Sequence, residues 1–267
     1  MDQTTSRLNP KVSINMATYN RGRYLAEAIN SILAQNFNNW ELIIIDDGST
    51  DNTQDILLPY LEDSRIKYFK NEKNLGICVT RNVALEKSSG EYVAILDSDD
   101  VWLAKDKLSQ QVDFLDFNYD YALVGTGVVT IDENGKEIKR YLNPEAAVPI
   151  KNSLLAKNSF AHSSVMYRRE IAIKLGSYPL NLNGIEDYDL WLRIGSKYKL
   201  HNLPLYHLGY RKHAGNISRT DRIRLMESNL ELTKKYRDLY PNFYWAWLRR
   251  SSRLFIAEIL SLLGIYF

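Results

Sequence analysis

The sequence has 267 residues, of which 45% are hydrophobic and 25% are charged, and its formal net charge at pH 7 is +2. This composition is ordinary for a folded globular protein and excludes a disordered or fibrous chain. A net charge so close to zero does not favour nucleic acid as a partner, because phosphate binding needs clustered Lys and Arg.

The first hundred residues predict alternating strands and helices. Val12, Ile14 and Met16 alternate as in a strand, and the apolar residues of 24–34 fall on one helical face. Residues 41–45 predict a strand that is buried on both faces. The elements predicted after it are a helix over 50–62, a strand over 66–70, a helix over 75–87 and a strand over 91–96. This alternation is typical of an α/β fold with a mostly parallel, Rossmann-like central sheet.

The second half of the chain predicts antiparallel additions to that sheet. Asn134-Gly135 is a strong hairpin signal between predicted strands at 121–131 and 137–142. Further strands are predicted at 163–168 and 203–210, helices near 150–157 and 187–196, and helical structure from Arg222 onwards. We therefore expect an α/β domain over 1–218, with halves at about 11–100 and 101–218, and a helical C-terminal extension over 219–267.

Three sets of polar residues follow predicted strands, at 18–20, 46–49 and 97–100. In open α/β sheets ligands bind at the carboxyl ends of the strands, so we expect these sets to converge. Asp97, Asp99 and Asp100 would repel one another unless a cation or hydrogen-bond donors neutralised them. The alternative is that these acids begin a helix, where the helix dipole favours negative charge.

Six motifs between residues 11 and 218 resemble, in order, those of the family-2 glycosyltransferases of the GT-A fold. They lie at 12–20, at 45–51, at 74–76 with 81–82, at 90–100, at 186–193, and at 210–213 with 216–218. The resemblance implies an inverting hexosyltransferase that moves a sugar from a nucleotide-diphosphate sugar, with a UDP-sugar favoured, to a hydroxyl of a glycan or lipid-linked acceptor. The Gln-x-x-Arg-Trp motif of processive synthases is missing, so we expect non-processive transfer.

The resemblance places the nucleotide-sugar in the half at about 11–100 and the acceptor in the half at about 101–218. It implies that Tyr19 stacks on the base, that Asp47 accepts a hydrogen bond from the base, and that Arg81 helps to hold diphosphate charge. The other nucleotide-binding residues it implies are Ala17, Asn20, Gly76, Asp97 and Ser98. The alternatives are a packing role for Tyr19 and a surface ion pair for Arg81.

The resemblance also implies a bound Mn²⁺ or Mg²⁺ ion, which would neutralise the charge that grows on the departing nucleoside diphosphate. Asp99 is the expected principal ligand, and His213 would supply a nitrogen ligand or a hydrogen bond to the diphosphate. Asp97 would contact the ribose, or the metal through water. The alternatives are a structural role for His213 and a helix cap for Asp100.

Asp187, at the start of a predicted helix, is by resemblance the general base that takes the proton from the acceptor hydroxyl, with Glu186 assisting or substituting. Ordinary helix capping is the alternative for this acid pair. His162, Ser163 and Trp191 are expected at the acceptor pocket.

Two rival functions remain. A sugar-phosphate nucleotidyltransferase also uses an α/β sheet and a metal-binding Asp, but its Gly-rich phosphate loop is missing here. An inactive nucleotide-sugar-binding or membrane-scaffold protein is the non-enzymatic alternative, and the acid pair Glu186-Asp187 argues against it.

The C-terminal segment is locally basic, with nine Lys or Arg against four Asp or Glu over 219–253, and residues 254–267 are mostly apolar. This pattern is typical of an interfacial helix on anionic lipid, although a helix packed on the domain or on a homodimer partner is the alternative. Residues 1–10 lack the apolar core of a signal peptide, and the lone Cys78 allows no intrachain disulfide. We expect a cytoplasmic enzyme of polysaccharide or cell-envelope biosynthesis, with peripheral contact to the inner face of the plasma membrane left open.

Overall fold

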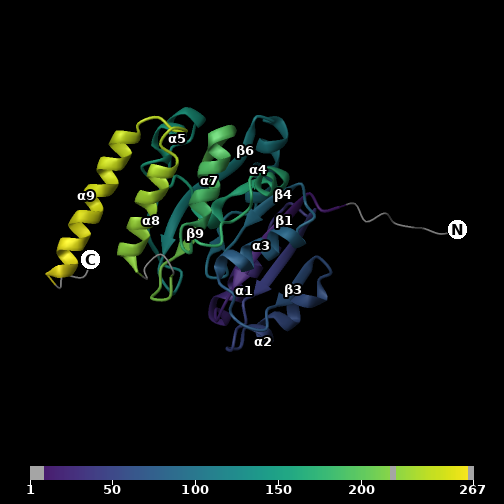
Figure 1. Ribbon diagram of the computed structural model, residues 1–267. Helices are drawn as coiled ribbons and strands as arrows, with labels where there is room; N and C mark the ends of the chain where they lie inside the picture. Colours follow the sequence, from purple (N-terminus) through teal and green to yellow (C-terminus); the bar gives the residue numbers. More distant parts are fainter. Residues whose placement is uncertain (1–8, 217–220, 264–267) are drawn as a thin grey trace.

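The first half of the chain forms the parallel part of a mixed sheet (Figure 1). The strands are β1 (Val12–Thr18), β2 (Trp40–Asp46), β3 (Ile66–Lys70) and β4 (Tyr92–Ile95), in the spatial order β3-β2-β1-β4. The helices between them are α1 (Gly22–Leu33), α2 (Thr53–Leu57) and α3 (Ile77–Lys87). This computed structural model describes residues 9–216 and 221–263. Every residue of β2 is buried, as expected for a strand covered by helices on both faces.

The second half of the chain extends the same sheet beyond β4. Its elements are β5 (Val101–Trp102), α4 (Lys107–Phe117), β6 (Tyr121–Ile131), β7 (Glu137–Tyr141), α5 (Ala147–Leu154), β8 (Met166–Arg168), α6 (Arg169–Lys174), α7 (Glu186–Lys197) and β9 (Lys199–Arg211). The order continues β4-β8-β6-β9-β5, with β7 paired to β6. β8 is antiparallel to β4 and β6, whereas β6 and β9 are parallel. The predicted fold class, a mostly parallel sheet with antiparallel additions and a helical C-terminal part, is confirmed.

The C-terminal helices α8 (Arg222–Lys235) and α9 (Phe243–Leu262) pack side by side, with α9 at the outer edge of the molecule (Figure 1). Leu232 and Tyr240 belong to the same hydrophobic cluster as Trp191 of α7, so these helices share the core of the α/β domain. The predicted domain boundary at 218/219 lies outside the described residues. Within 9–216 and 221–263, no helix combines the length and the hydropathy that crossing a membrane would require.

The sequence prediction missed α4, α6 and β5. In α4 the helical period is hidden because Lys107 and Gln111 occupy its buried face. The Lys107 ammonium donates to Gln111 Oε1 at 2.7 Å and lies 4.1 Å from the centre of the Trp102 ring, and burial lowers the pKa of Lys107 well below its usual range.

Two predicted elements differ in form. The helix predicted over 50–62 is divided into α2 and a 3₁₀ helix (Leu58–Glu62), because Pro59 has no backbone N–H to continue an α-helix. The strand predicted over 163–168 is instead a 3₁₀ turn (His162–Ser164) followed by the short strand β8.

Candidate functional site

A cavity of about 1170 Å³ opens at the carboxyl ends of β1, β2 and β4. All three polar sets that were predicted to converge contribute to its wall, as expected at the edge of such a sheet. The predicted site residues on this wall are Ala17, Tyr19, Asp47, Arg81, Asp97, Ser98, Asp99, His162, Ser163, Glu186 and Asp187. The predicted residues Asn20, Gly76, Trp191 and His213 are not among the residues that line it.

The loop after β1 is tied to the loop after β2 by Asn20, which has a positive φ of 51°. Its backbone N–H donates to Ser49 Oγ and its Oδ1 accepts from the Thr50 N–H, both at 2.9 Å. These contacts leave the Tyr19 ring, which is 43% exposed, on the cavity wall and not packed in the core.

The Asp47 carboxylate fixes the loop that precedes α3. Its Oδ1 accepts from the Leu75 N–H and from Asn71 Nδ2, both at 2.8 Å, and its Oδ2 accepts from the Gly76 N–H at 2.9 Å. Gly76 has a φ of 91°, which favours glycine at this loop end. Asp47 therefore fixes the loop before α3 in addition to lining the cavity.

Arg81 is buried between two acids and does not form the surface ion pair that was its alternative. Its Nη2 donates to Asp97 Oδ1 at 2.9 Å and its Nη1 donates to Glu186. Burial raises the pKa of Asp97, but the charges of Arg81 and His162 outweigh it and hold that pKa below its usual range. One guanidinium thus links the acidic loop after β4 to the first turn of α7.

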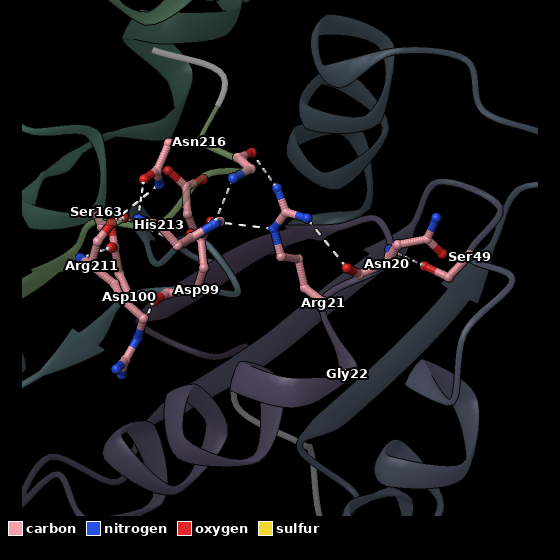
Figure 2. Close-up of polar contacts among 12 residues, drawn as sticks. Asn20, Arg21, Gly22, Ser49, Asp99, Asp100, Ser163, Arg211, His213 and Asn216 are labelled. Atoms are coloured by element: carbon pink, nitrogen blue, oxygen red, sulfur yellow. Dashed lines mark hydrogen bonds and ion pairs between the residues drawn. The ribbon is translucent and has the colours of Figure 1, made fainter. Parts of the chain in front are cut away.

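Asp99 and His213 face one another (Figure 2). His213 Nε2 lies 2.9 Å from Asp99 Oδ2. Two neighbouring ligands of an octahedral ion with bonds of about 2.1 Å are about 3 Å apart, so the spacing fits a shared divalent cation. The Gly215 N–H donates to His213 Nδ1 at 3.1 Å, which puts the ring proton on Nε2, where it donates to Asp99. Ligation through Nε2 requires that proton to leave.

Asp100 is not a helix cap, because the strand β5 follows it. Its Oδ1 accepts from the Arg211 N–H at 2.8 Å and its Oδ2 accepts from Ser163 Oγ at 2.6 Å. Burial raises the pKa of Asp100 well above its usual value, and the charges of Asp99 and Asp97 raise it further. Asp100 therefore fastens the end of β9, and with it the turn that carries His213, to the acidic loop.

Asp187 lines the cavity from the first turn of α7. Among the described residues its carboxylate accepts a hydrogen bond only from the Tyr188 N–H, at 2.7 Å, and no side chain caps α7. Burial raises the pKa of Asp187, against the opposing effect of His162, and the Glu186 carboxylate raises it further. A partly buried carboxyl group that lines a cavity and has a raised pKa is a suitable proton acceptor for a hydroxyl.

The three predicted acceptor residues occupy different positions. His162 lines the cavity and holds Asp97 through Nδ1 at 3.3 Å, while its Nε2 lies 3.2 Å from the Tyr178 hydroxyl. Ser163 is almost fully buried and donates to Asp100. Trp191 is fully buried, with its ring centre 6.2 Å from that of His162, so it supports His162 from behind and is not part of the wall.

Two groups of wall residues were missed in the sequence. Arg21 reaches the cavity from the start of α1. The others belong to the C-terminal helices and are Arg222, Arg224, Leu225, Met226, Asn229 and Arg253. The basic character of this segment was visible in the sequence, but which of its residues face the cavity follows only from the packing of α8 and α9.

The comparisons with known proteins agree on one family. Residues 13–176 match the family model described as "Glycosyl transferase family 2". "Putative glycosyltransferase EpsE" of Bacillus subtilis is 38% identical over 69% of this chain and 66% of its own length. "Putative teichuronic acid biosynthesis glycosyltransferase TuaG" of the same organism is 36% identical over 70% of this chain and 73% of its own length. The chain therefore spans slightly less than two thirds of EpsE.

A third relative carries a more specific name. "UDP-Glc:alpha-D-GlcNAc-diphosphoundecaprenol beta-1,3-glucosyltransferase WfgD" of Escherichia coli is 35% identical over 68% of this chain and 69% of its own length.

Two solved structures share the fold at low identity. Residues 1–349 of S. aureus TarS, in complex with UDP-GlcNAc, align with a TM-score of 0.68 at 24% identity, over 84% of this chain and 66% of that one. The mannosyltransferase PcManGT from Pyrobaculum calidifontis, in complex with GDP-Man and Mn²⁺, aligns with a TM-score of 0.67 at 19% identity, over 97% of this chain and 79% of that one.

Proposed function

The chain belongs to glycosyl transferase family 2, and from this premise we propose that it moves a sugar from a nucleotide-diphosphate sugar to a hydroxyl of a glycan or lipid-linked acceptor. The transfer is non-processive and inverts the configuration at the anomeric carbon. One observation carries the proposal. A single cavity is lined by Tyr19 and Asp47, by Asp99, which faces His213, and by the carboxylate of Asp187.

The donor lies along the carboxyl ends of β1, β2 and β4. The exposed ring of Tyr19 stacks on the base, and the wall at Ala17, Asp47 and Ser98 borders the nucleotide. A UDP-sugar is the favoured donor, because WfgD is named for UDP-Glc and a TarS structure contains UDP-GlcNAc.

Asp187 performs the proton transfer of the reaction. The acceptor oxygen forms a bond to the anomeric carbon, its proton passes to the Asp187 carboxylate, and the bond between that carbon and the diphosphate oxygen breaks. Arg81 keeps the Glu186 carboxylate paired beside Asp187, so Glu186 maintains the raised pKa of the base. A divalent cation held by Asp99 and His213 would supply charge neutralisation at the departing diphosphate.

The acceptor enters on the side formed by α8 and α9. Arg224 and Arg253 line this side of the cavity and suit an acceptor that carries phosphate groups. The name of WfgD specifies a diphosphoundecaprenol-linked substrate, and that of TuaG specifies teichuronic acid biosynthesis. These names support a place in the synthesis of a cell-envelope polysaccharide.

A panel of nucleotide sugars, each with and without Mn²⁺, tests the proposal through thermal stability and product analysis. One nucleotide sugar should raise the melting temperature, because a ligand that binds only the folded state stabilises it. Turnover with an acceptor should release a nucleoside diphosphate. Release of inorganic pyrophosphate would instead identify a nucleotidyltransferase, and binding without turnover on any acceptor would favour an inactive binding protein.

Asp99→Ala is expected to abolish the Mn²⁺ dependence of donor binding and to weaken binding in Mn²⁺ by at least about tenfold. The variant removes the oxygen that faces His213, whereas the donor contacts at Tyr19 and Asp47 remain. Asp113→Ala, on the solvent side of α4, is the control. Calorimetric titration of the donor measures the effect, and an unchanged Mn²⁺ dependence would remove Asp99 from the metal site.

The outer face of α9 is proposed to contact anionic lipid. Ala246 and Ala257 are buried on the inner side of the helix, and its apolar residues with the largest exposed fractions point away from the body. They are Tyr244, Trp245, Trp247, Leu248, Phe255, Ile256, Ile259 and Leu262. Arg249 and Arg253 flank this apolar face, an arrangement that suits the interface of a negatively charged membrane. The apolar segment predicted to end at Phe267 continues beyond the described residues.

Replacing Leu248 and Phe255 together by Ser is expected to lower sedimentation with vesicles of 30% phosphatidylserine by about tenfold, because two large apolar side chains no longer enter the lipid. Both are exposed in the protein, so folding should be preserved. Phe117→Ser, which removes an equally exposed aromatic ring from α4, is the control. Unchanged sedimentation would exclude a lipid contact, and conversion of a dimer to a monomer would assign this face to a second copy of the chain.

A further inference from the structure

Arg21 connects three segments that meet at the cavity (Figure 2). Its Nη2 donates to the Gly215 carbonyl at 2.6 Å and its Nη1 donates to the Asn20 carbonyl at 3.3 Å. Its Nε lies 3.4 Å from Asp99 Oδ2. A quarter of this side chain is exposed, so the guanidinium is both anchored and accessible from the cavity.

The Asp99 oxygen that Arg21 approaches is the one that His213 contacts. A guanidinium beside the proposed metal ligands supplies positive charge where the cation would bind, and two cations in such a place repel each other strongly. The Arg21 contact also holds Gly215, whose N–H donates to His213 Nδ1. The positive charge of Arg21 beside Asp99 favours the arrangement without metal.

Glycine at 215 allows this close approach. A Cβ built there would lie 3.1 Å from Arg21 Nη2 and 3.3 Å from His213 Nδ1. A Cβ at this position would require Arg21 or His213 to move by a few tenths of an ångström. Glycine therefore leaves both side chains in their close contacts with Asp99.

We propose that Arg21 is a donor-binding residue that neutralises Asp99 until a divalent cation binds, and that then contacts the diphosphate of the donor. The inference rests on the proposed function. The planar, forked guanidinium matches phosphate oxygens, and the cavity that contains the donor lies beside it. Transfer of Arg21 from Asp99 to the diphosphate leaves the Asp99 carboxylate available to the cation and releases Gly215. Metal and donor binding are thereby coupled through one side chain.

The proposal predicts effects of opposite sign for Arg21→Gln. Without nucleotide, Mn²⁺ should bind about tenfold or more tightly than to the wild type, because a competing positive charge is removed. In EDTA, UDP should bind about tenfold more weakly, because a charge-assisted contact to the diphosphate is lost. A merely structural role for Arg21 would weaken both ligands.

The matched control is Arg23→Gln, which removes the same charge two positions away. Arg23 is largely exposed, pairs loosely with Glu133 at 3.4 Å, and does not line the cavity. Free Mn²⁺ measured by electron paramagnetic resonance gives the metal affinity, and calorimetry gives the UDP affinity. Arg23→Gln should leave both within about twofold of the wild type, because its charge is screened by solvent.

Asp99→Ala separates the failure of this inference from that of the metal site. If Asp99→Ala abolishes Mn²⁺ binding but Arg21→Gln does not strengthen it, the inference is overturned and the metal site stands. If Asp99→Ala binds Mn²⁺ like the wild type, the metal site and the neutralisation of Asp99 by Arg21 are both overturned.

Arg21→Lys keeps the positive charge but loses the planar guanidinium, so it should retain the weaker Mn²⁺ affinity of the wild type. Unaltered UDP binding by Arg21→Gln would refute the donor contact.

Discussion

Asp187→Asn is expected to lower kcat for sugar transfer by about 10²–10⁴-fold while donor affinity stays within about twofold of the wild type. Asn keeps the shape of the side chain and can still accept a hydrogen bond from the Tyr188 N–H, but it cannot take up the proton of the acceptor hydroxyl. Initial rates with the donor and acceptor found in the nucleotide-sugar panel measure the loss. Near-normal turnover would remove Asp187 as the base.

The pH profile of the wild type provides a second readout of the same group. Only the ionised form of Asp187 accepts a proton, so kcat/KM should fall as the pH falls through the raised pKa of this group. That acidic limb should be missing in Asp187→Asn. Glu170→Gln, which removes an acid from the first turn of α6 outside the cavity, controls for a general effect of helix-terminal charge and should keep the wild-type profile.

Arg81→Met should lower the free energy of unfolding by about 3–5 kcal/mol, because it removes the guanidinium that pairs with the buried Glu186 and the partly buried Asp97. The two arms of the guanidinium contact these two acids. For a domain of this size the melting temperature should fall by roughly 6–20 °C. Thermal and denaturant unfolding measure both quantities. Arg65→Met, which breaks the partly exposed pair with Asp63, should cost no more than about 1 kcal/mol.

The destabilisation by Arg81→Met should depend on pH in a defined direction. In the wild type the lowered pKa of Asp97 means that its ionised form stabilises the fold at neutral pH, and that this contribution is lost only as the pH falls below the usual carboxyl range. In the variant, burial still raises the pKa of Asp97 while the largest effect that lowers it, the charge of Arg81, is gone. The loss of free energy of unfolding caused by Arg81→Met should therefore be smaller at pH 5 than at pH 8. Adding Glu186→Gln to Arg81→Met should recover part of the lost stability. A loss of stability that is independent of pH would contradict the pairing of Arg81 with Asp97 and Glu186.

Much of the fold was predictable because the spacing of apolar residues in the sequence matches the periods of strands and helices. The apolar run at 41–45 predicted the sheet. The polar sets after β1, β2 and β4 predicted the edge at which the cavity opens. α4 was not predictable from this signal, since Lys107 and Gln111 on its buried face are stabilised by Trp102 and by the backbone of other elements. Such compensation depends on tertiary contacts and leaves no local pattern.

The position of Asp97, Asp99, Asp187 and Arg81 on the cavity wall was predictable from the order of the motifs, but the ion pairs that these residues form were not. The acids alone would not have been enough, because acids at the start of a helix are also ordinary caps. The pairing of Arg81 with two acids, and the approach of Arg21 to Asp99, join residues that are 78 or more positions apart or lie on different elements. Only the assembled sheet brings them together.

The contacts of Asp100 also bear on how the enzyme matures during synthesis. The end of β9 is fastened to the acidic loop across 111 positions of sequence, and Asp99 meets His213 across 114. A chain that ends just after the acidic loop therefore already contains Arg81 for Asp97 and Arg21 for Asp99, but it lacks Arg211 and His213. The acidic loop acquires its full set of contacts only when the turn after β9 is in place.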